Sequence, residues 1–478
     1  MYTFIISAIL LVVGYVVYGA VVERIFGVNP SRPMPVTTHY DGVDYVPLPW
    51  WKIFFIQLLN IAGLGPIFGA IMGAVYGTAS FLWIVLGCIF GGAVHDYCAG
   101  MLSIRHDGES LPETIGRYMG KPFKQGIRVF TVLLMLQVGA VFIAGPAELL
   151  AGLTPDFMSV TFWVAVIFVY YLLATLLPID KLIGRIYPVF GAALIFMAFG
   201  VFASLIYYHP PIPEITQGIA NMHPDAGRHP IFPLLFISIA CGAISGFHAT
   251  QSPLMARCMK SERLGRRIFF GSMVAEGLIA LTWAAAAASF FGSFGGLQQF
   301  LAEHGNNAAP VVDVIVNTWM GRVGGMLAIL GVVAAPITSG DTALRSARLI
   351  IADIAGLEQR SVRRRIYITA PIFGAVILLL QVNFDVIWRY FAWSNQTLAA
   401  CTLWAVTVYF VQQKRFYWIT LIPAIFMTLV CSTYILIAPE GFALPDTAAY
   451  AGGAAFTAAI TLIFTFRMNK STAQGQCR

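Results

Sequence analysis

A polar motif interrupts a long apolar stretch near the middle of the chain. Residues 231–257 have the length of a membrane span, yet they contain the sequence CGAISGFHATQSP, which is rich in glycine, hydroxyl, amide and imidazole groups. A helix is broken at membrane depth only where protein or a water-filled cavity lines the break. The freed polar groups could therefore bind a solute; the alternative is a proline-kinked helix whose polar groups bond to neighbouring helices. The candidate substrate contacts are Ser245, Gly246, His248 and Gln251.

A second break is predicted in the apolar segment 50–75. Its sequence Ala-Gly-Leu-Gly-Pro brings Gly63, Gly65 and Pro66 close together. Glycine relaxes the backbone and proline removes a hydrogen-bond donor, so this combination specifies a deviation from helix. We expect an exposed carbonyl or amide at this break, which makes the same three residues candidates for substrate binding.

Ionisable residues near the end of the next apolar segment, 79–104, are candidates for ion coupling. The residues are His95 and Asp96. An ionisable side chain at membrane depth is costly and normally faces the interior of the bundle or an aqueous path. The pair could therefore carry a proton, whereas the alternative is that Asp96 caps a helix or pairs with Arg105 near the membrane surface.

A cluster of oxygen-bearing side chains follows Pro336. It contains Thr338, Ser339 and Asp341. Hard oxygen ligands of this kind can hold a monovalent cation such as sodium, and Asp341 alone could carry a proton. The alternative is an ion pair between Asp341 and Arg345, since helical residues four apart are neighbours on the helix surface.

Two amides and one further carboxylate lie within apolar segments. Asn395 and Gln396 belong to the segment 384–411 and are candidates to line the wall of a cavity opposite the two breaks. Glu276 is the lone carboxylate of the segment 264–293, and we expect it to pair within the helical bundle.

The composition indicates a polytopic membrane protein. Of the 478 residues 58% are hydrophobic and 11% are charged, with a mean hydropathy of +0.78, whereas soluble domains hold about 25% charged residues. The net charge of +7 does not indicate nucleic-acid binding, because most lysines and arginines fall in alternate connections, as the positive-inside rule describes. The seven cysteines have no CxxC pair and are interpreted as small buried hydrophobes, so no metal or cofactor is predicted.

A window of about 19 residues finds thirteen apolar segments, which predict an all-α polytopic membrane protein with about 13 transmembrane helices. They lie at 2–22, 50–75, 79–104, 127–152, 159–178, 185–208, 231–257, 264–293, 322–345, 364–381, 384–411, 415–437 and 448–467. The first segment is interpreted as a retained helix, because no basic stretch precedes it as in a signal peptide. The basic connections predict that the N-terminus lies outside and the C-terminus in the cytoplasm.

Segments two to six and seven to eleven form two sets of five. Because five is odd, the two sets cross the membrane with opposite topology, and each set opens with an interrupted helix. Such paired broken helices indicate the solute site of a secondary transporter built from inverted repeats. The predicted divisions are 1–49 (N-terminal helix and cytoplasmic loop), 50–208 (first repeat), 209–230 (extracytoplasmic loop), 231–411 (second repeat) and 412–478 (two C-terminal helices and tail).

Six short motifs, in order along nearly the whole chain, resemble those of the carbon starvation protein A family. They are Asp44-Tyr45-Val46-Pro47, Ile61-Ala62-Gly63-Leu64-Gly65-Pro66, Gly92-Ala93-Val94-His95-Asp96, Cys241-Gly242-Ala243-Ile244-Ser245-Gly246-Phe247-His248, Ser339-Gly340-Asp341-Thr342-Ala343-Leu344-Arg345 and Asn395-Gln396-Thr397-Leu398-Ala399. The resemblance implies a bacterial inner-membrane importer similar to proton-coupled pyruvate transporters and to peptide transporters. It also implies the five-plus-five inverted-repeat, leucine-transporter-like fold of the amino acid–polyamine–organocation superfamily, with one extra N-terminal and two extra C-terminal helices.

The expected function is the import of a small carboxylate nutrient, pyruvate in the first place, by proton symport and alternating access. A carboxylate suits the half-helix N-termini at the breaks, because these carry partial positive charge. The alternatives are a peptide or amino-acid transporter coupled to protons or sodium, and a nutrient receptor that does not transport. Neither GxSxG nor HExxH occurs, so an enzyme is not predicted. The expected partners are the solute, the coupling ion and the bilayer, and the segments outside the duplication are available for contacts in a homo-oligomer.

Overall fold

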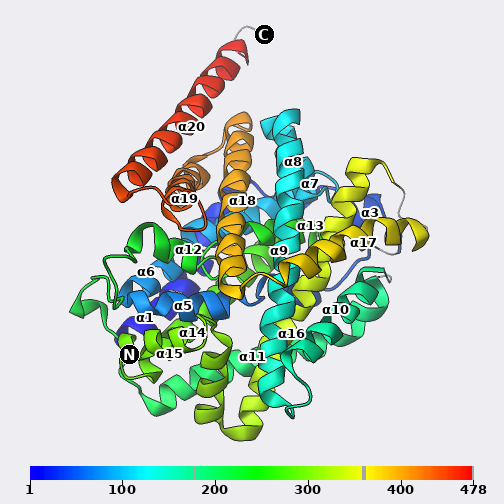
Figure 1. The fold of residues 1–478 in the computed structure, drawn as a ribbon. Helices are drawn as coiled ribbons and strands as arrows, with labels where there is room; N and C mark the ends of the chain where they lie inside the picture. The colour runs from blue at the N-terminus through cyan, green and yellow to red at the C-terminus, as the bar shows by residue number, and fades with distance from the viewer. Residues whose placement is uncertain (43, 177–178, 358–361, 476–478) are drawn as a thin grey trace.

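The computed structural model describes residues 1–42, 44–176, 179–357 and 362–475. Every regular element in these ranges is a helix (Figure 1). Each of the thirteen predicted segments corresponds to one helix or to a short run of helices, so the predicted all-α fold is confirmed. Eight helices in these ranges are long and apolar enough to cross a membrane, and one bent pair makes a ninth span.

The helices follow the predicted order along the chain. In the first part they are α1 (Tyr2–Val13), α2 (Gly19–Phe26), α4 (Trp50–Ile61), α5 (Ala70–Gly73), α6 (Thr78–Leu86), α7 (Ala93–Arg105), α8 (Leu111–Met119), α9 (Lys121–Leu153), α10 (Val160–Leu176) and α11 (Ile179–Tyr208). In the second part they are α12 (Phe236–Ser238), α13 (Gly246–Ala256), α14 (Gly271–Phe290), α15 (Phe294–Glu303), α16 (Ala309–Ala355), α17 (Val362–Leu379), α18 (Phe384–Gln412), α19 (Trp418–Ile437) and α20 (Asp446–Gly475).

The first predicted break lies between α4 and Gly65, where helix resumes as a short π-helical turn. The two parts, Trp50–Ile61 and Gly65–Tyr76, are bent by 58°. The glycines after the break form the contact surface toward the second break: a Cβ atom added at Gly65 would lie 2.2 Å from the Cβ atom of Cys241. A Cβ atom added at Gly73 would lie 2.2 Å from Cγ1 of Ile239. The two broken segments therefore pack directly on one another, and only glycine permits this approach.

The second predicted break separates α12 from α13. Helix α12 ends at Ser238, and α13 begins at Gly246 after Ser245, whose backbone is extended (φ −147°, ψ 125°). Within the break the indole Nε1 of Trp83 donates a hydrogen bond of 2.9 Å to the carbonyl oxygen of Ile239. Neighbouring helices thus satisfy backbone groups that the missing helical turns leave free.

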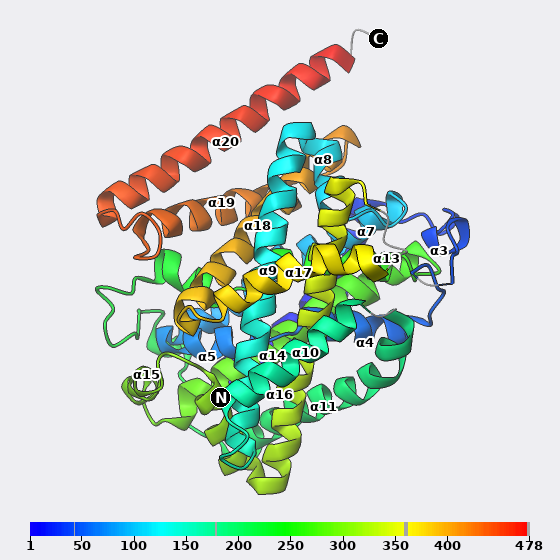
Figure 2. The same ribbon diagram turned by 45° about the vertical axis from the view of Figure 1, so that its right-hand side comes forward.

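The longest helices surround these two broken segments. Helix α16 packs along α9 and α11, while α18, α19 and α20 pack one after another on another side of the bundle (Figures 1 and 2). Helix α20 leans away from the rest of the molecule toward the C-terminus (Figure 2). The breaks consequently lie inside the bundle, and α20 lies at its margin.

Several helical stretches lie outside the predicted segments. The short helix α3 (Pro35–Thr38) and α8 lie in predicted connections, α15 was not expected, and α16 begins at Ala309, upstream of the predicted segment 322–345. The stretch before Gly321 is set apart from the span by that residue, whose positive φ of 68° breaks the helical backbone. Helices this short fall below a window that is tuned to membrane-spanning length.

One end of the bundle gathers the connections that follow α2, α7, α13 and α18, and we call it the basic face. Its centre is the buried carboxylate of Glu262. The guanidinium Nε atoms of Arg32 and Arg105 lie 3.2 and 3.3 Å from Glu262 Oε1, and the backbone N–H of Asn29 donates to Oε2 at 2.7 Å. Arg105 also donates to the carbonyl oxygen of Gly27 at 2.8 Å. The loop after α2 is thereby fixed to the ends of α7 and the turn that leads into α14.

The opposite end of the bundle is covered by the loop 209–230. Its His223 is buried, stacks on His229 at 4.1 Å between ring centroids and contacts the ring of Tyr76 at 5.4 Å. Burial and the neighbouring His229 lower the pKa of His223 to about 4. The loop therefore packs on the outer end of the first broken segment with this histidine neutral.

We expect Gly246→Ala to destabilise the protein. A Cβ atom at Gly246 would lie 2.5 Å from the backbone nitrogen of Ala399 and from the carbonyl oxygen of Asn395, so the backbones of α13 and α18 would have to separate. The cost is about 1–3 kcal/mol, measurable as a lower midpoint of thermal unfolding in detergent. Gly374→Ala is the control, because a Cβ atom there meets nothing within 4 Å. Equal midpoints for both variants would contradict this packing.

Candidate functional site

Two of the predicted groups of polar residues meet in one buried cluster. His95 and Asp96 lie in the first turn of α7, His248 in the first turn of α13 and Glu276 within α14. The Asp96 carboxylate lies between two imidazoles, with Oδ1 2.8 Å from Nδ1 of His95 and Oδ2 2.9 Å from Nδ1 of His248. On the far side of its ring, Nε2 of His248 lies 3.4 Å from Oε2 of Glu276. All four side chains have an exposed fraction of 0%.

The charge of this cluster requires bound protons. A carboxylate buried away from water is stable only when it is paired or protonated. If His248 donates from Nδ1 to Asp96 and is otherwise neutral, its Nε2 carries a lone pair that faces Glu276. A proton is then needed on Glu276, or on Nε2 as a second imidazole proton, because otherwise a lone pair and a carboxylate would face each other at 3.4 Å. One proton held between His248 and Glu276 would remove this repulsion.

The structure does not place Asp96 against Arg105, which was the alternative at this position. Arg105 pairs with Glu262 at the basic face, and its Nη1 donates to the Tyr409 hydroxyl. Asp96 faces the interior of the bundle, as an ionisable residue at membrane depth should. The sequence analysis expected a partner for Glu276 within the bundle, but it could not identify His248 as that partner.

Thr338 and Ser339 lie against the first break. The Ser339 hydroxyl lies 3.0 Å from the carbonyl oxygen of Leu59 and 2.9 Å from that of Asn60, and the Thr338 hydroxyl lies 3.4 Å from that of Leu59. These two carbonyls belong to the last turn of α4, where the bend removes their partners within the helix. The two hydroxyls of α16 and the two carbonyls of α4 therefore form a buried group of oxygen atoms.

Asp341 belongs to the same helix and has a different environment. Its Oδ1 lies 3.7 Å from Nη2 of Arg345, and the same guanidinium donates to the carbonyl oxygen of Ala174 at 2.6 Å. The predicted ion pair at this spacing is therefore present. Asp341 and the Asp96 cluster are separate buried acidic groups on different helices.

Asn395 and Gln396 hold the second break. Asn395 Oδ1 accepts from the Ser245 hydroxyl at 3.0 Å and from the backbone N–H of Phe247 at 2.7 Å. Gln396 donates to the carbonyl oxygen of Phe236 on the other side of the break. Both amides had been expected on a wall across a cavity from the breaks, whereas the structure places them in contact with the broken segment itself.

Several buried polar atoms have no hydrogen-bond partner among the described residues. They include both side-chain atoms of the Gln57 amide, Oε1 of Gln251 and Nε2 of His95. Helix α4, which carries Gln57, packs against α13, which carries Gln251. A buried polar atom without a partner costs about 1–3 kcal/mol, so these atoms are candidates to contact a solute or water. Gln57 was missed by the sequence analysis, although an amide within FFIQLLN is a visible exception in an apolar run.

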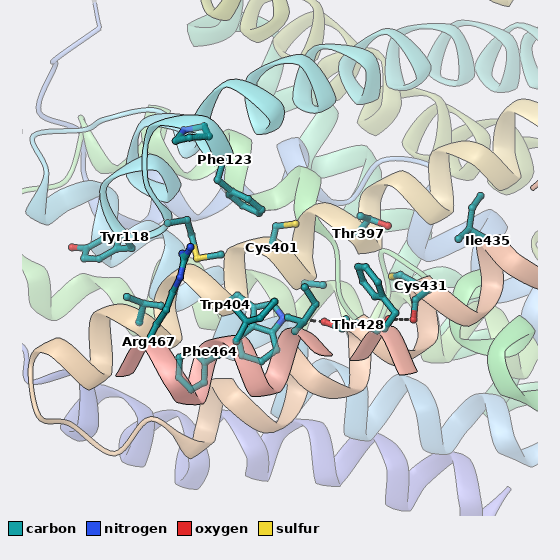
Figure 3. A pocket seen from close by; sticks show the side chains of 18 of the residues that line it. Tyr118, Phe123, Thr397, Cys401, Trp404, Thr428, Cys431, Ile435, Phe464 and Arg467 are labelled. Carbon is teal, nitrogen blue, oxygen red and sulfur yellow. Dashed lines mark hydrogen bonds between the residues drawn. The ribbon is translucent and has the colours of Figure 1, made fainter. Parts of the chain in front are cut away.

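A cavity of about 940 Å³ lies elsewhere, between α18, α19 and α20 (Figure 3). None of the predicted site residues lines it. The two breaks are closely packed, with Gly63, Gly65, Pro66, Ser245, Gly246 and Gln251 all buried.

Solved transporters share this architecture. The manganese transporter of Eremococcus coleocola, in complex with an aromatic bis-isothiourea substituted compound, matches with a TM-score of 0.57 over 91% of this chain and 98% of its own, at 12% identity. MhsT, in complex with L-phenylalanine, matches with a TM-score of 0.58 over 81% of this chain and 99% of its own, at 14% identity. The chain therefore has the leucine-transporter-like fold of a secondary transporter, which confirms the predicted class of fold.

The sequence comparisons define the family within this class. The chain belongs to the family of the carbon starvation protein CstA, whose model matches residues 1–156, 152–323 and 295–434. A membrane protein of Haemophilus influenzae is 45% identical over 59% of this chain and 89% of its own. In Escherichia coli, the "Peptide transporter CstA" is 24% identical over 89% of this chain and 79% of its own. The "Pyruvate/proton symporter BtsT" of the same organism is 24% identical over 87% and 78%.

We expect Asn395→Ala to destabilise the second break. The substitution leaves the Ser245 hydroxyl and the backbone N–H of Phe247 buried without their acceptor, at a cost of about 1–3 kcal/mol. Thr402→Ala is the control on the same helix, because the Thr402 hydroxyl bonds only to the carbonyl oxygen of Leu398 one turn earlier. Thermal unfolding in detergent compares them, and a smaller loss for Asn395→Ala than for Thr402→Ala would contradict the assigned role.

Proposed function

We propose that this chain is a proton-coupled importer of a small carboxylate nutrient, with pyruvate as the favoured substrate. The observation that carries the proposal is the buried contact of His248 with both Asp96 and Glu276. It joins a site that needs a proton to the first turn of α13, the helix that begins at the second break. The curated relatives support transport as such, since one bears the name of a proton symporter and others that of a peptide transporter.

The substrate class rests on the chemistry of the breaks. A helix N-terminus offers unpaired backbone N–H groups and partial positive charge, which suit a carboxylate. Pyruvate and a peptide both carry this group, so both would use the N-terminus of α13. Among the described residues, the buried amides of Gln57 and Gln251 carry atoms without a hydrogen-bond partner, and they are candidate contacts for the rest of the solute.

In the proposed mechanism the proton and the solute act on the same helix. Protonation of the His248–Glu276 pair removes the repulsion between a lone pair and a carboxylate, which favours the packed arrangement of α13, α7 and α14. Loss of that proton leaves Glu276 as an unpaired buried charge and favours separation of these helices. Solute bound at the start of α13 would therefore move with the proton through alternating access.

We expect saturable uptake of labelled pyruvate into proteoliposomes of the purified protein, stimulated by an inward proton gradient. The measurement is repeated without the gradient and with a labelled dipeptide. Uptake of the dipeptide but not of pyruvate would support a carrier whose substrate is a peptide. Counterflow of pyruvate in the absence of a gradient separates a carrier from a receptor, because a receptor binds the solute without exchanging it.

We expect His248→Gln and Glu276→Gln to uncouple transport from the proton. Each variant removes the exchangeable proton of the pair at nearly constant volume, so stimulation by the gradient should be lost. His304→Gln is the control, because His304 is exposed at the end of α15. Undiminished stimulation in both cluster variants, with protein in the membrane at normal amount, would exclude the pair as the coupling site.

Sodium coupling is the second candidate, and the oxygen group at the first break favours it. Four oxygens from Thr338, Ser339, Leu59 and Asn60 lie close together, which are ligands of the kind that hold a monovalent cation. If protons drive transport, we expect Ser339→Ala to weaken the packing of α4 without changing which ion gradient drives uptake. Uptake driven by a sodium gradient at fixed pH, and lost in Ser339→Ala, would replace the proton by sodium.

We also propose an orientation of the chain in the membrane. The positive-inside rule assigns the basic face to the cytoplasm and the loop 209–230 to the outside, in a bacterial inner membrane. The N-terminal helix and the two C-terminal helices, which lie outside the two sets of five, are available for contacts in a homo-oligomer.

A further inference from the structure

The cavity of about 940 Å³ has an apolar wall (Figure 3). It is lined by aromatic and aliphatic side chains of α18, α19 and α20, among them Trp393, Trp404, Ile435, Phe456 and Phe464. Helix α20 packs closely on α19, and it reaches α18 where the ring centroids of Phe464 and Trp404 lie 5.2 Å apart. The cavity is thus bounded by three helices of the C-terminal part and lies apart from the two breaks.

The hydroxyl groups in the wall are already bonded. Thr397, Thr428 and Ser432 each donate to the carbonyl oxygen four residues earlier in their own helix, at 2.9, 2.7 and 2.7 Å. The indole Nε1 atoms of Trp393 and Trp404 donate to the Cys431 carbonyl and to the Thr428 hydroxyl, both at 2.9 Å. These hydroxyl and indole groups offer no free donor to a hydrophilic nutrient, so this part of the wall suits an apolar occupant.

One end of the cavity is polar and positively charged. Arg467, Tyr118 and Gln412 line this end, and Figure 3 shows Arg467 beside Tyr118. The Tyr118 hydroxyl lies 2.6 Å from Nε2 of His106, which follows directly on α7, so this end opens at the basic face. Arg467 is exposed and has no ion-pair partner among the described residues. A long apolar slot with a cation at one end matches the chemistry of an anionic phospholipid.

We infer that this cavity binds one anionic phospholipid, with its acyl chains between α18, α19 and α20 and its phosphate at Arg467. A helix from a second copy of the chain is the other possible occupant, but the cation at one end of the cavity favours an anionic headgroup. The lipid site is independent of the proposed transport function. Its wall is one side of α18, and Asn395 and Gln396 on the same helix hold the second break.

Native mass spectrometry of the full chain tests the inference. The protein is titrated with phosphatidylglycerol and, separately, with phosphatidylcholine of the same acyl chains. We expect one tightly held phosphatidylglycerol per chain, bound in preference to phosphatidylcholine. Arg467→Gln should lower the affinity for phosphatidylglycerol about fivefold and leave that for phosphatidylcholine unchanged. Equal binding of the two lipids by the unmodified chain would overturn the assignment of the headgroup.

Two further variants locate the site. Cys401→Trp places a large side chain in the cavity wall and should abolish binding of the tightly held lipid. Arg322→Gln is the control, because Arg322 is also exposed but lies outside the cavity. Arg467→Gln changes an exposed residue and should fold normally. It therefore still tests the site if Cys401→Trp does not fold. An affinity for phosphatidylglycerol that is unchanged in Arg467→Gln, or a dimer that holds no lipid, would overturn the inference.

Discussion

The structure depends on the burial of Asp96 between two imidazoles, one of which also faces Glu276. Two carboxylates in one buried site repel each other unless protons or cations compensate them, and the imidazoles of His95 and His248 are the groups within reach. Three helices from separate parts of the chain supply these residues. The packing of α7, α13 and α14 therefore depends on the number of bound protons. An ion-coupled carrier requires a dependence of this kind.

Both close backbone packing and side-chain hydrogen bonds stabilise the two breaks. Glycine allows the two broken segments to approach each other, as at Gly65 against Cys241. Polar side chains from neighbouring helices then bond to the exposed backbone, as Ser339 does at the first break and Asn395 at the second. Helices α16 and α18 thus act as a frame that holds irregular backbone inside the bundle.

The sequence predicted the fold and both breaks because these are encoded locally, by apolar length, by Gly-Pro combinations and by polar residues within apolar runs. The contact of His248 with Asp96 could not be predicted, since 152 residues separate them and neither residue type specifies its partner. Asn395 was expected opposite a cavity because an amide suits solute binding and backbone capping equally well. Gln57 was missed because one amide in an apolar run does not specify its partner, whereas glycine and proline signal a break.

The carboxylate of Glu262 at the basic face has a kinetic consequence. Two guanidiniums and a backbone N–H from separate segments share this one buried group, so no single contact can be broken without weakening the others. If the loop after α2 moved away from α7, the buried Glu262 carboxylate would lose part of the charge that compensates it. A separation of these segments would have to disrupt the contacts of Glu262 together, so we expect the network to slow opening at this end of the bundle.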